Sequence, residues 1–432
     1  MSGFLDDWLP PMPQNWRVQP LFTVATERVQ PNTGFRESRV LSLSYGKVVE
    51  RDVESNFGLL PETFESYNIV EPNDIVMRLT DLQNDQRSLR TGQVTEQGVI
   101  TSAYVTIVPS ADLTPRFAHY LLHGYDLAKV FYRMGGGLRQ SLKYADLKHL
   151  PLLVPPHSEQ TRIANFLDEQ TARIDALIAE KERLWDECRD MEEVTAFGLI
   201  IRGEQVSCRR TNYPEPWLKG IPAHWGLAKL RHIASIGNGS TPKRDNPDYW
   251  QNGDIPWLNS SSVNSSRISE ASDFVTGQAR QECHLPMVRA GSTVVALTGQ
   301  GKTRGSAALT EFETSISQHL AYVALFDRRL SDEYLWVVLT GLYSVLRYLS
   351  EGEGSTKGAL TCERLNQLRV PVPPSYEQTG MLEAFTHRTS VIQELRGGAY
   401  ASISLLREYR ASLISAAVTG QLDINNFGRQ VA

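Results

Sequence analysis

The spacing of apolar residues divides the chain into strand-like and helix-like stretches. From residue 12 to about residue 154, short apolar runs such as Val40–Leu43 and Tyr104–Val108 alternate with turn residues. Runs of this length between turn signals are typical of β-strands. Thr114–Tyr132 instead carries its apolar side chains on one side of a helix, and glycines 135–137 follow it. The pattern predicts a strand-rich domain that carries one helix.

The apolar period changes at residue 158 to that of a long helix. Up to about residue 200, side chains recur at intervals of three and four, which is the spacing of a coiled-coil seam. The predicted seam positions, one of them a lysine, are Ile174, Leu177, Lys181, Leu184, Cys188 and Met191. About 40 helical residues make a rod of roughly 60 Å. Pro155-Pro156 would give this rod an extended entry. An amphipathic helix packed on a globular core is the alternative.

The second half of the chain repeats this order of elements. Residues 205–369 again contain strand-like runs, among them Val294–Leu297 and Leu320–Leu325. Asp332–Leu349 is the matching helical stretch, and Gly352-Glu353-Gly354 follows it. A second strand-rich domain with one helix is therefore predicted.

A second long helix is predicted for residues 376–418. Its seam positions are Phe385, Ile392, Leu395, Ala399, Leu406, Tyr409 and Leu413. Ser375 and Gln378 have the spacing of a capping box at its start. Gly397-Gly398 is unfavourable inside a helix by about 1 kcal/mol per glycine, so we expect a kink or an interruption there.

Two short motifs recur at a long interval. Residues 142–160 align with residues 360–378 at a shift of 218, including Pro-Pro and Glu-Gln in both copies, and a threonine follows each copy. Pro13-Gln14-Asn15-Trp16 similarly resembles Pro222-Ala223-His224-Trp225. The repeats of solenoid proteins are only some tens of residues long. The interval therefore indicates a duplicated unit that consists of one domain and one helix.

Each predicted rod is too long to pack along one domain, so the simplest arrangement pairs the two rods with each other. We expect an α+β protein with two similar strand-rich domains, two paired long helices and an internal pseudo-two-fold repeat. Two similar halves suit a target that is itself bipartite. The expected boundaries are 1–154 for the first domain, 155–204 for the first long helix, 205–372 for the second domain and 373–432 for the second long helix.

Composition and charge narrow the class of protein. The net charge is −5, and residues 151–204 hold 6 Lys and Arg against 12 Asp and Glu, whereas residues 205–369 hold 18 against 15. Compact DNA-binding domains usually have a pI above about 9, so any DNA affinity of this chain alone should be modest. No long apolar run or basic leader is present, and the four cysteines are scattered. We expect a reduced, cytoplasmic protein with no membrane span.

Familiar catalytic motifs are incomplete in this chain. Thr298–Thr303 resembles the end of a phosphate-binding loop, but Ala296 stands where the loop needs its first glycine. Asn246-Pro247-Asp248-Tyr249 differs at its third residue from the Asn-Pro-Pro-Tyr loop of amino-methyltransferases. His319, beside Gln318, could act in catalysis, although histidines in loops more often make structural hydrogen bonds. The sequence argues against an enzyme acting alone, and we expect neither catalytic residues nor a metal site.

Recognition chemistry is better represented. Several polar loops combine cations with small hydroxyl and amide residues, which suit phosphate oxygens and base edges. The candidate DNA-binding residues in these loops are Arg78, Arg87, Arg90, Ser240, Thr241, Lys243, Arg244, Asn259, Ser260, Lys302, Thr303 and Arg304. Solvated loops with no ligand are the alternative for any one of these residues.

Several motifs together carry a family resemblance. Pro-Pro-x-x-Glu-Gln occurs at residues 155–160 and 373–378, each time at the start of a long helix. The others are Gly239-Ser240-Thr241-Pro242, Tyr249-Trp250, Ile255-Pro256-Trp257-Leu258, Ser315-Ile316-Ser317-Gln318-His319-Leu320 and the C-terminal stretch 406–420. Over essentially its whole length the chain resembles the specificity subunit of Type I restriction-modification systems.

The resemblance implies a function and a set of partners. It implies that each strand-rich domain is a target recognition domain for one half of a split double-stranded DNA sequence, and that the long helices form an antiparallel coiled coil. The helices would dock two methyltransferase subunits, with motor-nuclease subunits completing the complex. S-adenosylmethionine, ATP and Mg would be bound by those partners, and this subunit would have no active site. The coiled-coil residues used for docking and pairing would be Ile174, Leu177, Leu184, Met191, Ile392, Leu395, Leu406 and Leu413.

Two other classes of protein stay open at this point. A coiled-coil scaffold that holds two protein-binding modules would show no sequence-selective DNA binding with any partner. A standalone adenine DNA methyltransferase would bind S-adenosylmethionine as an isolated chain. Within the resemblance, Gly397-Gly398 is unexpected in a spacer helix.

Overall fold

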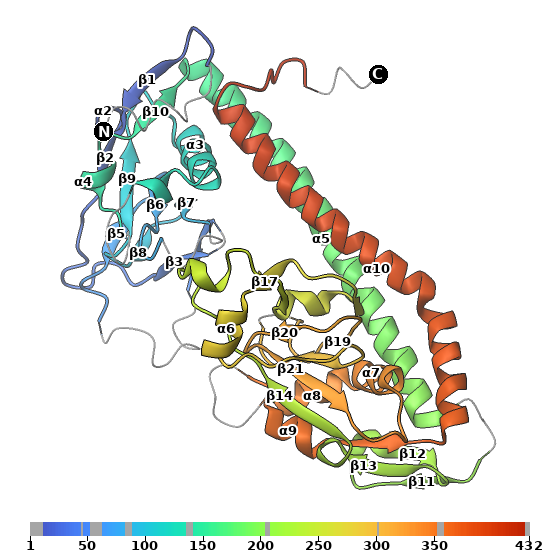
Figure 1. The fold of residues 1–432 in the computed structure, drawn as a ribbon. Helices are drawn as coiled ribbons and strands as arrows, with labels where there is room; N and C mark the ends of the chain where they lie inside the picture. Colours follow the sequence, from blue (N-terminus) through green and yellow to red (C-terminus); the bar gives the residue numbers. More distant parts are fainter. Residues whose placement is uncertain are drawn as a thin grey trace. The chain divides into compact units, whose positions relative to one another are not determined.

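The chain forms two compact units, shown in Figure 1. The computed structural model describes residues 12–44, 46–51, 63–82, 89–134, 141–203, 208–299, 302–351 and 358–427. The first unit comprises residues 1–178 and 404–432, and the second comprises residues 179–403. Two long helices, α5 (His157–Arg202) and α10 (Ser375–Val418), contribute one segment each to both units. Each long helix begins and ends within two residues of the bounds that the sequence predicts.

The first unit is built on an antiparallel sheet with strand order β2-β9-β6-β7. Two-stranded pairs β1-β10, β3-β4 and β5-β8 surround it. Its elements are β1 (Arg17–Pro20), α2 (Leu21–Val24), β2 (Ala25–Glu27), β3 (Leu41–Ser44), β4 (Lys47–Glu50), β5 (Asn68–Val70), β6 (Ile75–Met77), β7 (Thr91–Gln93), β8 (Gly98–Ile100), β9 (Val105–Pro109), α3 (Pro115–Leu127), η1 (Phe131–Arg133), α4 (Tyr144–Leu147) and β10 (Pro151–Val154).

The second unit has a five-stranded sheet of order β14-β21-β18-β19-β16 and a three-stranded sheet of order β17-β15-β20. Its elements are β11 (Arg210–Asn212), η2 (Pro216–Leu218), β12 (Lys219–Pro222), β13 (Gly226–Lys229), η3 (Leu230–His232), β14 (Ala234–Asn238), η4 (Pro247–Tyr249), β15 (Ile255–Leu258), η5 (Ser260–Asn264), β16 (Arg267–Ile268), β17 (Asp273–Val275), α6 (Gly277–Glu282), β18 (Thr293–Ala296), β19 (Ala307–Thr310), β20 (Ser315–Ile316), β21 (Leu320–Leu325), α7 (Asp332–Gly341), α8 (Tyr343–Ser350), α9 (Cys362–Gln367) and β22 (Arg369–Val372).

The two units share one topology, which confirms the internal repeat. Strands β14, β21, β18 and β19 pair in the same order as β2, β9, β6 and β7. The strand before the long helix pairs antiparallel with the strand that follows the Pro-x-x-Trp motif in both units, as β10 with β1 and β22 with β13. Helices α3 and α7 each follow the corresponding strand, β9 or β21. The predicted second-domain helix at 332–349 is divided at Leu342 into α7 and α8.

The tryptophan of the repeated Pro-x-x-Trp motif packs into the hydrophobic core of each unit. The backbone N–H of Trp16 donates to the Pro13 carbonyl, and the backbone N–H of Trp225 donates to the Pro222 carbonyl, both at 3.0 Å. The motif therefore forms the same turn twice. Both indoles are buried. The residue before each tryptophan contacts the long helix: Asn15 Nδ2 donates to Glu159 at 3.0 Å, and His224 Nε2 lies 2.6 Å from Glu377.

The glutamine of Pro-Pro-x-x-Glu-Gln joins each long helix to its domain. Gln160 Nε2 donates to the carbonyls of Asp112 (2.8 Å) and Pro155 (2.9 Å), and its Oε1 accepts from the Thr114 N–H (2.8 Å). Thr114 is the N-cap residue of α3. Because Gln160 is fully buried, these bonds fix the start of α5 against the start of α3.

Gln378 does the same in the second unit. It donates to the carbonyls of Arg329 (2.7 Å) and Pro373 (2.9 Å) and accepts from the N–H of Ser331 (3.0 Å), the N-cap of α7. The predicted capping box of Ser375 and Gln378 was therefore wrong. The helix starts one residue earlier than a box would need, and the Gln378 amide is already fully used by the domain.

The long helices pack against each other antiparallel in each unit. In the first unit Asp175 contacts Arg410, and Arg162, earlier in α5, contacts Asn425, which lies beyond α10. In the second unit Glu192 contacts Arg396. An antiparallel coiled coil is thus formed, but its seam differs from the predicted one. On α5, side chains that are buried or partly buried at intervals of four and three form the seam. They are Leu167, Thr171, Ile174, Ile178, Lys181, Trp185, Cys188 and Glu192.

The seam on α10 is equally polar in places. Its positions are Phe385, Thr389, Ile392, Arg396, Ala399, Ile403, Leu406, Arg410, Leu413 and Ala417. Ile174, Ile392, Leu406 and Leu413 were predicted correctly, and Leu184 is partly buried beside the seam. Leu177, Met191 and Leu395 were predicted wrongly, because they are 46%, 58% and 51% exposed. The sequence pattern favoured these apolar residues, whereas the seam uses the next residue along, which is polar at Glu192 and Arg396.

Gly397 and Gly398 do not interrupt α10, which is helical throughout. An added Cβ at either glycine would meet no atom within 4 Å. Replacing either with alanine is therefore expected to stabilise the protein by about 0.5–1 kcal/mol, because alanine has the higher helix propensity. Urea denaturation of the single variants measures this, and a lower midpoint in either variant would contradict it.

In the ranges that the structure describes, no helix is long and apolar enough to cross a membrane.

Candidate nucleic-acid interface

Three polar loops of the second unit meet at one end of its sheets. They follow β14, β15 and β20 and contain residues 239–246, 259–264 and 317–319. Gly239 brings the first loop onto the third, since an added Cβ would lie 1.7 Å from the Ile316 carbonyl oxygen. The Ser240 N–H donates to that same oxygen at 3.2 Å. Only glycine permits this close approach, which explains structurally why the Gly239-Ser240-Thr241-Pro242 motif begins with glycine.

A chain of side-chain hydrogen bonds links these loops. The Thr241 hydroxyl donates to Gln318 Oε1, and Gln318 Nε2 lies 3.4 Å from His319 Nε2. His319 Nδ1 in turn lies 2.7 Å from the Thr298 hydroxyl. Gln318 and His319 are both exposed. The side chains therefore present amide, imidazole and hydroxyl groups to solvent in a fixed arrangement.

Arg244 lies against two tryptophans in the same region. Its guanidinium carbon is 3.8 Å from the ring centre of Trp250 and 5.1 Å from that of Trp257. Asp273 accepts from it at 3.3 and 3.4 Å. The indole N–H groups of the two tryptophans donate to the carbonyls of Lys243 (3.0 Å) and Ser240 (3.2 Å). Stacking and the ion pair hold Arg244 in one orientation while half of its side chain stays exposed.

Asn259 and Ser260 begin the short helix η5 beside Arg244. Asn259 Oδ1 accepts from the Ser261 N–H at 2.8 Å as the N-cap, and its Nδ2 lies 3.4 Å from Asp273. Asp273 therefore bridges Arg244 and Asn259. The structure brings together six of the predicted residues: Ser240, Thr241, Lys243, Arg244, Asn259 and Ser260.

Lys302 and Arg304 make their polar contacts outside this hydrogen-bond network. Lys302 Nζ forms an ion pair with Asp186 of α5 at 2.9 Å. Arg304 donates to the Gly358 carbonyl at 2.7 Å, and its side chain is 12% exposed. Thr303 packs against Gly299. Arg304 therefore has a structural role, and this loop faces the helical segment.

In the first unit, Arg90 was misassigned as a DNA contact. It is fully buried, and its guanidinium donates to the carbonyls of Arg78, Thr80 and Asp81 at 2.7–3.3 Å. A sequence pattern cannot distinguish such a buried loop clamp from an exposed phosphate contact. Arg78 is partly buried beside it, and Arg87 lies outside the described residues.

The motifs weighed for catalysis have structural roles. Asn246 caps η4 through the Asp248 N–H, and the Tyr249 hydroxyl donates to Glu282 at 2.7 Å. That bond lowers the pKa of Glu282 and raises the pKa of Tyr249. Among the described residues there is no group of three or more His, Cys, Asp or Glu that could hold a metal ion. The surface offers recognition groups, with donors and acceptors suited to base edges and phosphates.

Comparison with known proteins shows which family the chain resembles. Residues 222–399, which include all three loops, match the model of the Type I restriction modification DNA specificity domain. The chain is 21% identical over 325 residues to the MjaIX specificity subunit of Methanocaldococcus jannaschii, covering 74% of this chain and 71% of that one. It is also 21% identical over 328 residues to the EcoR124I/EcoR124II specificity subunit of Escherichia coli, covering 73% and 74%. The chain is therefore similar to the specificity subunits of Type I restriction enzymes.

The fold of this chain is also found in a solved structure of a type I R-M system, described as the basis of complex assembly and conformational transition. The TM-score is 0.50 at 16% identity, covering 96% of this chain and 100% of that one. The sequence selected part of the polar surface that the three loops form. Gln318, Thr298 and Asp273 were missing from the predicted set, and a Gln-His pair between two strand runs is the sequence signal for the first of them.

Proposed function

We propose that this subunit reads a bipartite double-stranded DNA target through its two recognition domains, residues 1–154 and 205–372. The long-helix regions 155–204 and 373–432 dock two methyltransferase subunits and the motor-nuclease subunits. In this proposal the chain has no active site, and S-adenosylmethionine, ATP and Mg are bound by the partners.

The observation that carries the proposal is the exposed network around Gln318. A glutamine held by Thr241 at one oxygen keeps its amide available for an adenine edge, and Arg244 beside it suits guanine or phosphate. The shared topology of the two units supports a second reading surface in the first domain. The modest net charge also fits a subunit that shares phosphate contacts with partners.

Exposed apolar residues on the long helices support the docking role. Leu177, Met191, Leu395 and Tyr409, which the sequence pattern placed in the seam, are 46–58% exposed. In this proposal the partner subunits cover these side chains.

Mapping of methylated adenines tests the proposal. The chain would be co-expressed with its methyltransferase partner in a host free of adenine methylation, and the genome read by long-read sequencing. A split motif with a fixed gap that disappears when this chain is omitted supports the proposal. Absence of any motif, with the complex present in solution, contradicts it and favours the scaffold. Calorimetric binding of S-adenosylmethionine to the isolated chain would favour a standalone methyltransferase.

Gln318→Ala is expected to relax the motif in the second half-target alone. Loss of one base-edge contact reduces discrimination by about 1–3 kcal/mol, or about 5- to 150-fold. The relative methylation of cognate and single-mismatch sites measures this. Gln367→Ala, which removes an exposed glutamine of α9 in the same unit, is the control and should leave the motif unchanged. Equal relaxation in both halves would refute the assignment of Gln318.

A further inference from the structure

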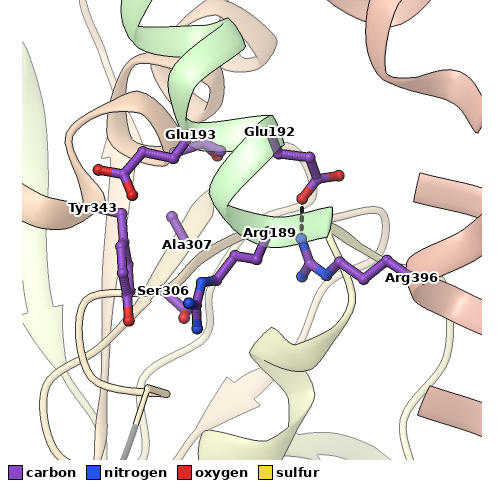
Figure 2. A pocket seen from close by; sticks show the side chains of 8 residues that line it. Arg189, Glu192, Glu193, Ser306, Ala307, Tyr343 and Arg396 are labelled. Carbon is purple, nitrogen blue, oxygen red and sulfur yellow. Dashed lines mark hydrogen bonds and ion pairs between the residues drawn. The ribbon is translucent and has the colours of Figure 1, made fainter. Parts of the chain in front are cut away.

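A buried ion pair lies in the coiled-coil seam of the second unit. Arg396 of α10 donates from Nη1 to Glu192 of α5, and the two side chains are 8% and 1% exposed. Figure 2 shows Arg396 reaching across to Glu192 at the edge of a small cavity of about 20 Å³. Burial of two charges costs free energy that their attraction only partly returns, so such a pair is weak evidence for a stabilising role.

Both members of the pair also bond the recognition domain. Arg396 Nη2 donates to the Asn264 carbonyl at 2.8 Å, and the Ser266 hydroxyl donates to Glu192 at 3.3 Å. Asn264 is the last residue of η5, and Ser266 directly precedes β16. The ion pair thus holds the end of η5 from inside the coiled coil.

Helix η5 connects this anchor to the recognition surface. It runs from Ser260 to Asn264, next to the N-cap Asn259. Five residues of 3₁₀ helix span roughly 10 Å, and runs of this length are uncommon without support at their ends. Asn259 and Asp273 fix the first end, Arg396 fixes the second, and Val263 is buried between them.

The surroundings hold Arg396 in place. Its guanidinium lies 5.4 Å from the ring centre of Trp185, and Arg189 lies 5.5 Å from the same ring and 4.8 Å from that of Tyr343. Arg189 in turn bonds Asp190 at 2.7 Å. Planar stacking and a two-pronged donor are properties that lysine lacks.

We propose that Glu192 and Arg396 are positioning residues for DNA recognition, which fix the base-reading end of η5 relative to the coiled coil. The inference rests on the proposed function of the second domain. A purely structural pair would need no bonds to a recognition loop, whereas this pair directs one bond from each partner to the segment 264–266.

The first unit supplies a matched control pair. Asp175 accepts from Arg410 Nε at 2.8 Å and Nη2 at 3.4 Å, also between α5 and α10. This pair is more exposed, at 44% and 25%, and the two hydrogen bonds from Arg410 both go to Asp175. The same residue exchange can therefore be made in a seam ion pair of the other unit.

The test uses the full chain co-expressed with its methyltransferase partner, with adenine methylation mapped across the genome. Glu192→Met with Arg396→Met keeps an unbranched apolar filling of the seam, which ion-pair replacement generally tolerates. We expect the first half-target to be kept and discrimination in the second half to fall about tenfold. Arg396→Lys keeps the positive charge but loses the second donor nitrogen, so it should relax discrimination in the second half to a smaller extent. Asp175→Met with Arg410→Met should not relax the second half.

The outcomes distinguish a failure of the positioning role from a failure of the proposed function. If the wild-type complex produces no split motif, the proposed function fails. If the wild type produces one, and both Glu192/Arg396 variants keep full discrimination in the second half or relax both halves equally, the positioning role is overturned. Should the double methionine variant yield no folded complex, Arg396→Lys alone decides, because it retains the ion pair.

Discussion

Gln378→Leu is expected to destabilise the second unit by about 3–5 kcal/mol. The leucine has a similar size but leaves the carbonyls of Arg329 and Pro373 and the N–H of Ser331 without their hydrogen bonds. Gln378 is 3% exposed, so water cannot readily replace these bonds. Each unpaired buried group costs about 1–3 kcal/mol.

Chemical denaturation of the full chain, followed by tryptophan fluorescence, measures this loss. Gln160→Leu should produce a similar loss in the first unit, because Gln160 makes the same three bonds. Gln367→Leu, at an exposed position of α9, is the control and should change stability by less than about 0.5 kcal/mol. A midpoint for Gln378→Leu close to that of the control would show that the amide does not join helix and domain.

The stability of the first unit should fall as the pH drops below 6.5. Burial, together with the neighbouring charge of Arg410, lowers the pKa of His119 to about 4. Burial, His119 and Arg410 lower the pKa of His123 to about 3. Both rings border a cavity of about 350 Å³ that is also lined by Lys47, Tyr120, Asp168, Thr171, Asp175 and Arg410.

The direction follows from proton binding. An unfolded histidine takes up a proton below pH 6.5, whereas the folded ring stays neutral until about pH 4 or 3. Folding stability is therefore complete above pH 6.5 and decreases on acidification, by roughly 2 kcal/mol per histidine at pH 5. Denaturation at pH 7.5 and pH 5 should show this loss, and His119→Gln with His123→Gln should reduce it. An equal loss in the double variant would assign the acid sensitivity to carboxylates elsewhere.

The sequence predicted the elements better than the contacts between them. Apolar runs located β21 and both long helices, because burial imposes a period on the residues of one element. The seam was misplaced by one residue at Leu177, Met191 and Leu395. The charged side chains of Glu192 and Arg396 occupy the seam beside Met191 and Leu395, whereas Ile178 occupies it beside Leu177. A sequence pattern can assign a charged residue to a seam only when its ion-pair partner is known. Glu192 and Arg396 are 204 residues apart in the sequence, so the pattern does not connect them.

The polar loops also show the limit of prediction from sequence. Loop composition found Arg244 and Asn259, which the structure joins through Asp273, but it also selected Arg90 and Arg304. All four are polar residues in loops, and only the fold decides that Arg90 faces backbone carbonyls while Arg244 faces solvent. The repeated Glu-Gln motif was recognisable from sequence, yet two of the three hydrogen bonds of its glutamine go to residues almost 50 positions earlier in the chain.

The pairing of β1 with β10 and of β13 with β22 has a consequence for how each unit can vary. Arg17 lies opposite Val154, and Gly226 lies opposite Val372, so the two ends of the segment between the paired strands lie about 5 Å apart. A different segment needs only to keep this strand pair and the bonds of one glutamine. The long helices can therefore stay unchanged while the residues between the paired strands vary.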